Sequence, residues 1–120
     1  MVQQSIIQVK SFQFALEIIR LYIQLQDEHE WVLSKQLLRS GTSIGANVEE
    51  ATGGQSNRDF LSKMSIASKE ARETLYWLRL LKESDLTKID VSEYLDKSQE
   101  LVRILSSIVK TTESKLRTKN

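Results

Sequence analysis

The side chains that could do chemistry are few and lie far apart in this sequence. It has one histidine, His29, and no cysteine, so it has no thiolate metal ligands. No Glu stands three residues before His29, and the Glu-x-x-His pairs that build di-iron bundles are therefore absent. A Ser or Thr nucleophile would need His29 as its base, and His29 falls in a predicted turn with no carboxylate placed to orient it. We expect no catalytic residue, no bound metal and no cofactor.

The nearest approach to a charged constellation is made up of Glu49, Glu50, Glu70, Arg72 and Glu73. Paired carboxylates can act as general acid and base. On exposed flanks of helices, however, they are far more often solvated or held in ion pairs. We interpret this group as structural, and we expect that the protein is not an enzyme.

A basic stripe with an aromatic residue in it is the more informative pattern. The stripe consists of Arg58, Lys69, Arg72, Tyr76 and Arg79, which fall within about 80° of one another on a helix, opposite its apolar face. Such a stripe could follow a phosphate backbone while Tyr76 stacks on a base. The alternative is a solvated face, or one used for salt bridges between subunits, and the neighbouring Glu73 favours that alternative. Both interpretations stay open from the residues alone.

Composition limits the scaffold that can position these residues. The chain of 120 residues has no Pro and only four Gly, so almost nothing forbids helix along its length, and we expect one all-α domain over residues 1–120. With 17 basic and 16 acidic side chains the net charge is +1, which provides no overall field to attract nucleic acid. No apolar run is long enough to span a membrane. We expect a soluble, untargeted, cytoplasmic protein that does not bind membranes.

Caps and apolar spacing predict helices over about residues 5–28, 32–52, 56–83 and 90–116. Ser5 with Gln8 matches a capping box, and Ser56 is followed three residues later by Asp59. Gly53 should close the second helix in the left-handed conformation. Short connections between long helices predict an antiparallel up-down-up-down four-helix bundle.

The second helix contains two glycines, Gly41 and Gly45, in a stretch of small residues, GTSIGAN. As a loop, this stretch could bind a phosphate, but it lacks the Gly-Lys-Ser/Thr ending and the preceding strand of a phosphate-binding loop. As a helix, it continues the apolar spacing from Leu33 to Ala51. We therefore predict a helix in which Gly41 and Gly45 let a neighbouring backbone approach closely.

The first and third helices carry more apolar residues than one buried stripe needs. The first helix has one row made of Phe12, Leu16, Ile19 and Ile23, and a second row made of Phe14, Ile18, Leu21 and Leu25. A helix in a monomeric bundle buries one stripe, so the surplus indicates contact with another subunit. We assign this subunit interface to Phe14, Ile18, Leu21 and Leu25, together with Ile66, Trp77 and Leu80 on the third helix.

Several motifs in the middle of the chain resemble a known family. They are SKQLLRSGTSIGAN at residues 34–47, EEA at 49–51, DF at 59–60 and KEARETLYWL at 69–78. These residues resemble the bacterial four-helix-bundle proteins of the 23S ribosomal RNA intervening-sequence family. The resemblance implies a ring-like homopentamer with no known enzymatic activity.

The resemblance also implies that, in some relatives, the open reading frame lies inside an rRNA gene. A related branch, the accessory variability determinants of diversity-generating retroelements, looks like a nucleic-acid-binding partner of a reverse transcriptase. We therefore expect one of two functions. The first is a non-catalytic assembly that binds structured RNA or DNA, and the second is a structural or adaptor oligomer whose partner is a protein.

Overall fold

Four helices make up the computed structural model, which describes residues 4–118. They are α1 (Ile6–Asp27), α2 (Leu33–Thr52), α3 (Asn57–Ser84) and α4 (Ser92–Thr118). Every regular element in these residues is a helix, so the all-α class with four helices is confirmed. No helix in the described part of the chain combines the length and apolarity needed to cross a membrane.

Side-chain caps fix the starts of α1 and α3 where the sequence predicts them. At α1 the Gln8 backbone N–H donates to Ser5 Oγ (3.3 Å), and the Ser5 N–H donates to Gln8 Oε1 (2.9 Å). At α3 the Asp59 N–H donates to Ser56 Oγ (3.1 Å). Each contact satisfies a backbone donor that the first turn of a helix leaves free.

The start of α2 is capped by a residue outside the helix that the sequence analysis did not single out. The carboxylate of Glu30 accepts hydrogen bonds from the backbone N–H groups of Val32, Leu33 and Ser34, at 2.8, 3.1 and 2.6 Å. A negative charge at this end of a helix also opposes the positive pole of its dipole. Glu30 therefore does the work that a Ser or Asp N-cap does elsewhere.

The end of α2 corrects one expectation. Gly53 has φ −90° and ψ 2°, and no glycine in the described residues has a positive φ. The helix closes through right-handed turns instead, with the Gly53 N–H donating to the Glu49 carbonyl and the Gly54 N–H to the Ala51 carbonyl, each at 3.2 Å. The left-handed residues lie in the other two connections, at His29 (φ 64°) and Asp85 (φ 57°).

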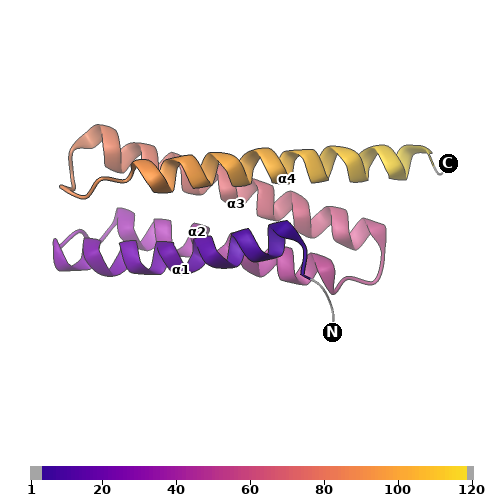
Figure 1. The fold of residues 1–120 in the computed structure, drawn as a ribbon, viewed down its shortest axis with the longest axis horizontal. Coiled ribbons are helices and arrows are strands. Elements are labelled where there is room, and N and C mark those ends of the chain that lie inside the picture. The colour runs from indigo at the N-terminus through magenta and orange to yellow at the C-terminus, as the bar shows by residue number, and fades with distance from the viewer. Residues whose placement is uncertain (1–3, 119–120) are drawn as a thin grey trace.

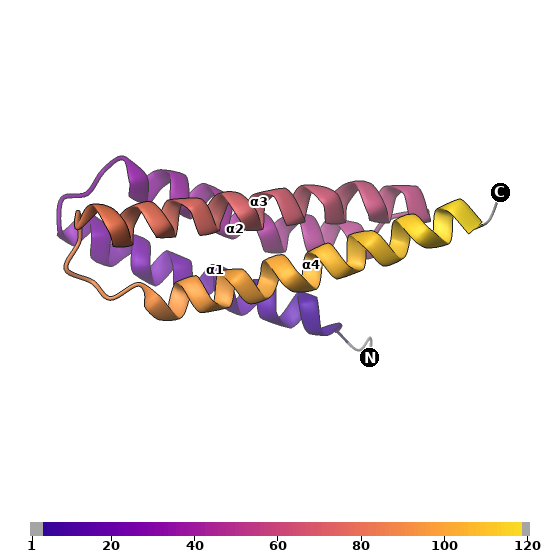
Figure 2. The same ribbon diagram turned by 90° about the horizontal axis from the view of Figure 1, so that it is seen from above.

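The helices lie side by side in the order of the chain (Figures 1 and 2). The α1–α2 and α3–α4 turns lie at one end of the molecule, and the α2–α3 turn lies at the other end (Figure 1). The contacts between α1 and α4 are far less extensive than those between consecutive helices. The molecule is accordingly elongated, measuring 52 × 31 × 20 Å, and α4 extends past the α2–α3 turn.

The core corrects the interface predicted on α1. Phe14, Ile18, Leu21 and Leu25 are at most 2 % exposed within the single chain, so they cannot form a subunit contact. They pack with the apolar faces of the other helices, which include Leu37, Ile44, Leu78, Leu101 and Leu105. The other row of α1, made of Phe12, Leu16, Ile19 and Ile23, faces outward and is 39–61 % exposed. We call this second set the outer row.

The glycines of α2 explain which row of α1 is buried. A Cβ built on Gly41 would lie 2.9 Å from Ile18 Cγ2, and one built on Gly45 would lie 3.3 Å from the Ser11 carbonyl oxygen. These are contacts that only a residue without a side chain accepts comfortably. The α1 helix therefore packs against α2 along the side that carries Ser11 and Ile18, and the outer row is left in solvent.

We expect Gly45→Leu to lower the free energy of unfolding by about 1 to 3 kcal/mol, because the new side chain would be forced against the α1 backbone at Ser11. The better helix propensity of leucine recovers less than about 1 kcal/mol of this loss. The matched control is Gly53→Ala, whose Cβ would meet only carbonyl oxygens at 3.7 and 3.9 Å. Urea titrations followed by circular dichroism compare the variants, and equal midpoints for Gly45→Leu and the wild type would refute the close-packing account.

Candidate nucleic-acid interface

The basic stripe lies on the solvent side of α3, as its spacing predicts. Arg58, Lys69, Arg72, Tyr76 and Arg79 are all exposed. Lys69, Arg72 and Tyr76 follow one another at intervals of three and four residues and so lie on successive turns of one face. The full stripe from Arg58 to Arg79 spans about 32 Å along the axis. It is thus a line of contacts suited to an extended ligand, and it does not converge on one point.

Ion pairing leaves most of this stripe available. Arg79 Nε lies 3.6 Å from Glu83 Oε2, whereas Arg58, Lys69 and Arg72 form no ion pair within residues 4–118. Glu73, the acidic neighbour in the sequence, is engaged elsewhere. Its Oε2 accepts from Arg39 Nη2 at 2.7 Å and from Trp77 Nε1 at 3.1 Å. Glu73 is therefore turned toward α2 and is held by other partners.

Tyr76 presents an aromatic surface beside these cations. Its side chain is 53 % exposed, and its ring contacts Trp77 edge to face, with centroids 5.2 Å apart and planes at 68°. Trp77 is half-buried and fixed by its hydrogen bond to Glu73. Tyr76 is thus supported on one side and free on the other, which is the arrangement a stacking platform needs.

Two exposed apolar patches lie on either side of α2. On one side, the outer row of α1 borders a groove of about 280 Å³ between α1 and α2. Small residues of α2, Gly45 and Ala46 with Thr42, form the opposite wall of that groove. On the other side lie Ile66, which is 39 % exposed, and the half-buried Trp77 and Leu80 of α3. Trp77 is tied to α2 through Glu73 and Arg39.

Sequence reasoning identified both rows of α1 but assigned the interface to the wrong one. The two rows have the same spacing and similar apolar content, so periodicity could not separate them. The signal that separates them is the pair of glycines on α2, because a close approach selects the partner row that carries Ser11. The placement of Ile66, Trp77 and Leu80 at the surface of the chain leaves their assignment to an interface a prediction.

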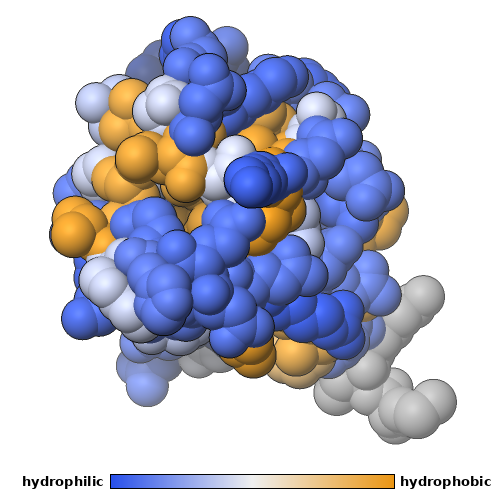
Figure 3. Space-filling model, turned by 90° about the vertical axis from the view of Figure 1, so that its left-hand side faces the viewer, coloured by the Kyte–Doolittle hydropathy of each residue, from blue (hydrophilic) through white to orange (hydrophobic). Residues whose placement is uncertain are grey.

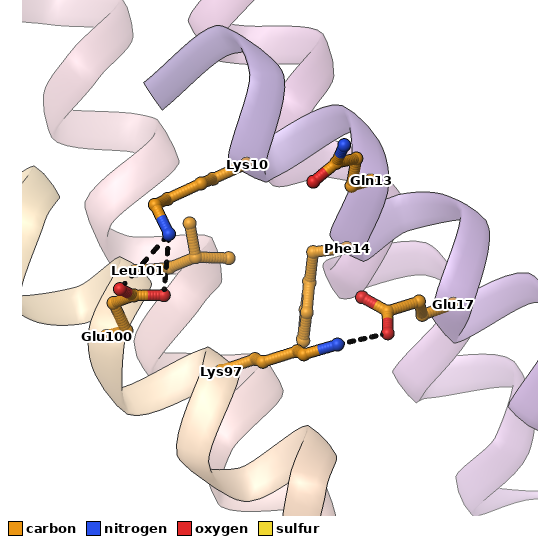
Figure 4. Close-up of a pocket in the computed structure, with 7 residues that line it drawn as sticks. All are labelled: Lys10, Gln13, Phe14, Glu17, Lys97, Glu100 and Leu101. Carbon is orange, nitrogen blue, oxygen red and sulfur yellow. Dashed lines mark hydrogen bonds and ion pairs between the residues drawn. The ribbon is translucent and has the colours of Figure 1, made fainter. Parts of the chain in front are cut away.

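The junction between α1 and α4 is held by two ion pairs of opposite polarity (Figure 4). Lys10 Nζ lies 3.2 Å from Glu100 Oε2, and Lys97 donates a short hydrogen bond to Glu17. Between the pairs is a hollow of about 80 Å³ walled in part by Phe14. All four charged side chains are partly exposed, so each pair contributes at most about 1 kcal/mol.

Two pKa values near this junction are displaced. The hydrogen bond from Lys97 to Glu17 raises the pKa of the Lys97 ammonium, and the Glu17 charge adds to the effect. Partial burial raises the pKa of the Tyr94 hydroxyl, assisted by the nearby carboxylates of Glu17 and Glu93. Both shifts favour the protonated form, so Lys97 stays charged and Tyr94 stays neutral near neutral pH.

The groups considered for catalysis are dispersed. His29 lies in the α1–α2 turn, where its ring packs edge to face against Trp31 with centroids 5.5 Å apart. Glu50 faces Lys63 at 3.9 Å, and Glu73 is bound by Arg39. Within residues 4–118 no three His, Asp or Glu side chains come together in a way that could hold a metal ion. The geometry instead gathers unpaired cations and an exposed aromatic ring on α3.

Comparisons with known proteins identify a matching family and a similar solved structure. Residues 3–107 match the family model described as 23S rRNA-intervening sequence protein. A solved structure from Bacteroides thetaiotaomicron, described as a protein of unknown function from the S23 ribosomal protein family, is 45 % identical with a TM-score of 0.81. That similarity covers 88 % of this chain and 96 % of the other. No protein with curated annotation matches this chain.

Proposed function

The chain belongs to the 23S rRNA-intervening sequence protein family, and from this premise we propose that it is a non-enzymatic, oligomeric nucleic-acid-binding protein. In this proposal the up-down-up-down bundle assembles as a homopentameric ring in the bacterial cytoplasm. The basic stripe on α3 of each copy binds RNA or DNA. The observation that carries the proposal is the combination of an uncovered apolar row on α1 with unpaired cations on α3.

Free energy favours covering the outer row. Phe12, Leu16, Ile19 and Ile23 are 39–61 % exposed, and burying the rest of each side chain is worth roughly 1 kcal/mol. Soluble monomers seldom leave a contiguous row of this kind in water. A second copy of the chain is available at every concentration at which the protein is present, which makes self-association the economical way to cover it.

A ring needs two different patches that fit each other, because each copy must bind one neighbour at each side. The outer row with the α1–α2 groove supplies one patch, and Ile66, Trp77 and Leu80 supply the other. The two patches lie on opposite sides of α2, which suits a head-to-tail contact. The number five comes from the family resemblance, since nothing in the geometry of one chain determines how many copies close the ring.

Repetition would compensate for the weak charge of one chain. The net charge is only +1, so a single stripe binds nucleic acid weakly at physiological salt. Five stripes on one ring would act on one RNA molecule, and each contact after the first would form at a high effective concentration. Oligomerisation and nucleic-acid binding are therefore coupled in this proposal.

The alternative function is an adaptor oligomer that binds a protein such as a reverse transcriptase. One observation favours it: Trp31, Val32 and Leu86 are at least half exposed in the two turns at one end of the bundle. Figure 3 views this end and shows apolar side chains interrupting the polar surface. The two turns are tied together there by a hydrogen bond from Thr87 to Glu28, so the end is a firm platform for a partner.

We expect light scattering coupled to size exclusion to give a mass near five times the 13.8 kDa of one chain. The double variant Phe12→Asp, Ile23→Asp should run as a monomer with unchanged helicity, because both side chains point away from the core. Leu86→Asp, which also places a charge on an exposed apolar site, is the control and should leave the oligomer intact. If the wild type has the mass of one chain, the proposal that it forms an oligomer is refuted. If it is a dimer or tetramer, only the fivefold ring is refuted.

We also expect the protein to bind a hairpin RNA with a single-stranded loop, with an affinity that falls steeply as salt rises. Lys69→Gln with Arg79→Gln should make the slope of log K against log salt shallower by roughly 1.4 to 1.8, since two phosphate contacts are lost. Tyr76→Leu should weaken binding by about 1 to 3 kcal/mol and leave the slope unchanged, because stacking is not ionic. Absence of any gel shift at low salt would count against nucleic-acid binding and in favour of the adaptor.

A further inference from the structure

A groove runs between α3 and α4 on the side of the molecule away from α1. Two adjoining hollows, of about 380 and about 270 Å³, form it. Glu113 lines both hollows and marks the point where they meet. Arg58 and Arg117 border the first hollow, and Arg72 and Lys110 border the second. The α4 helix thus adds two cations to two that belong to the basic stripe of α3.

The cations of this groove have no ion-pair partner in the described residues. None of its four cations takes part in an ion pair within residues 4–118, although Glu113 lies among them. The neighbouring junctions differ, because Lys10 and Lys97 are paired between α1 and α4, and Arg39 and Lys63 are paired between α2 and α3. With one carboxylate among four cations, the α3–α4 groove carries a local charge of about +3 at neutral pH.

Serine hydroxyl groups lie in the second hollow. Ser65 and Ser68 come from α3, and Ser106 comes from α4. No hydrogen bond joins any of these three hydroxyls to another group in the described part of the chain. By contrast, Ser40, Ser43 and Ser98 donate to carbonyl oxygens one turn earlier in their own helices. Ser68 is buried, at 4 % exposed, whereas Ser65 and Ser106 are partly exposed. The hydroxyls of Ser65 and Ser106 are thus free to donate to a ligand that carries acceptor oxygens.

The length of the groove selects the kind of anion. Arg58 and Arg72 are 14 residues apart on one helix, a rise of about 21 Å, which is far longer than a single phosphate group. Tyr76, one turn beyond Arg72, exposes its ring at the end of this line. Cations spaced along a groove, hydroxyl donors on its wall and an aromatic ring beside it match a single nucleic-acid strand.

We infer that the α3–α4 groove binds the sugar–phosphate backbone of a single-stranded nucleic acid. Arg58, Arg72, Lys110 and Arg117 would contact successive phosphates, and the hydroxyls of Ser65 and Ser106 would donate to phosphate oxygens. Glu113 opposes this binding by its charge. The inference rests on the proposed nucleic-acid function and adds to it a site half built from α4. Lys110 and Arg117 lie beyond residues 3–107, the part that matches the family model.

The test is fluorescence anisotropy with labelled oligouridylate and oligothymidylate of equal length, titrated at a series of salt concentrations. Lys110→Gln with Arg117→Gln should raise Kd about tenfold for both oligonucleotides and make the salt slope shallower by about 1.4. Both side chains are exposed, so the fold should survive, and circular dichroism checks it. Ser65→Ala with Ser106→Ala should raise Kd without changing the slope.

The matched control is Arg20→Gln with Lys35→Gln, which removes one Arg and one Lys from exposed sites outside the groove. It should change Kd by less than about twofold, because these charges lie far from the bound strand and are screened. Glu113→Gln should tighten binding by about twofold, a result that general loss of structure would not produce. A groove variant that binds no more weakly than this control, or a Glu113→Gln protein that binds less tightly, would overturn the site.

Failure of this site can be told apart from failure of the proposed function. If the wild type binds neither oligonucleotide nor the hairpin RNA, nucleic-acid binding fails and the groove fails with it. If the wild type binds, and Lys69→Gln with Arg79→Gln weakens binding while Lys110→Gln with Arg117→Gln does not, the stripe on α3 stands and the groove alone is rejected.

Discussion

The close approach of α1 to α2 is the constraint on which the rest of the molecule depends. At Gly45 the backbone of α2 comes so near to α1 that a Cβ would lie 3.3 Å from the Ser11 carbonyl oxygen. The same approach, continued at Gly41 against Ile18, fixes the rotation of α1 about its axis. Once that rotation is fixed, one apolar row must enter the core and the other must face solvent. The exposed outer row is therefore a consequence of two missing side chains on the neighbouring helix.

Ion pairs between helices lie at some of the helix junctions and not at others. The contact between α1 and α4 is the least extensive of the four helix junctions, and two ion pairs join these helices. Ion pairs also link α2 to α3. At the α3–α4 junction no cation is paired across the helices in residues 4–118. The apolar core holds the bundle together, and the cations at the α3–α4 junction stay available for an external anion.

Much of this fold follows from local sequence, whereas the rotation of α1 depends on packing between helices. Ser5, Gln8 and Ser56 cap helices through contacts within a few residues, so the sequence predicts them. The buried row of α1 depends on α2, about 30 residues away, and periodicity carries no such information. Two local features also escaped prediction: Gly53 keeps a right-handed conformation, and Glu30 caps α2 from outside the usual N-cap position. The exposure of the basic stripe was predictable, whereas its extension by Lys110 and Arg117 required the packing of α3 against α4.

The central claim is that a second copy of the chain covers the outer row of α1, and the reactivity of one introduced thiol tests it most directly. The chain has no cysteine, so Ile19→Cys provides a single thiol in the outer row, and Lys35→Cys provides one on the exposed surface of α2. Alkylation rates are measured over a series of protein concentrations. The account predicts that the thiol at position 19 reacts slowly in concentrated protein and faster on dilution, while position 35 keeps a constant rate. If the thiol at position 19 reacts as fast in concentrated protein as in dilute protein, the result contradicts the account.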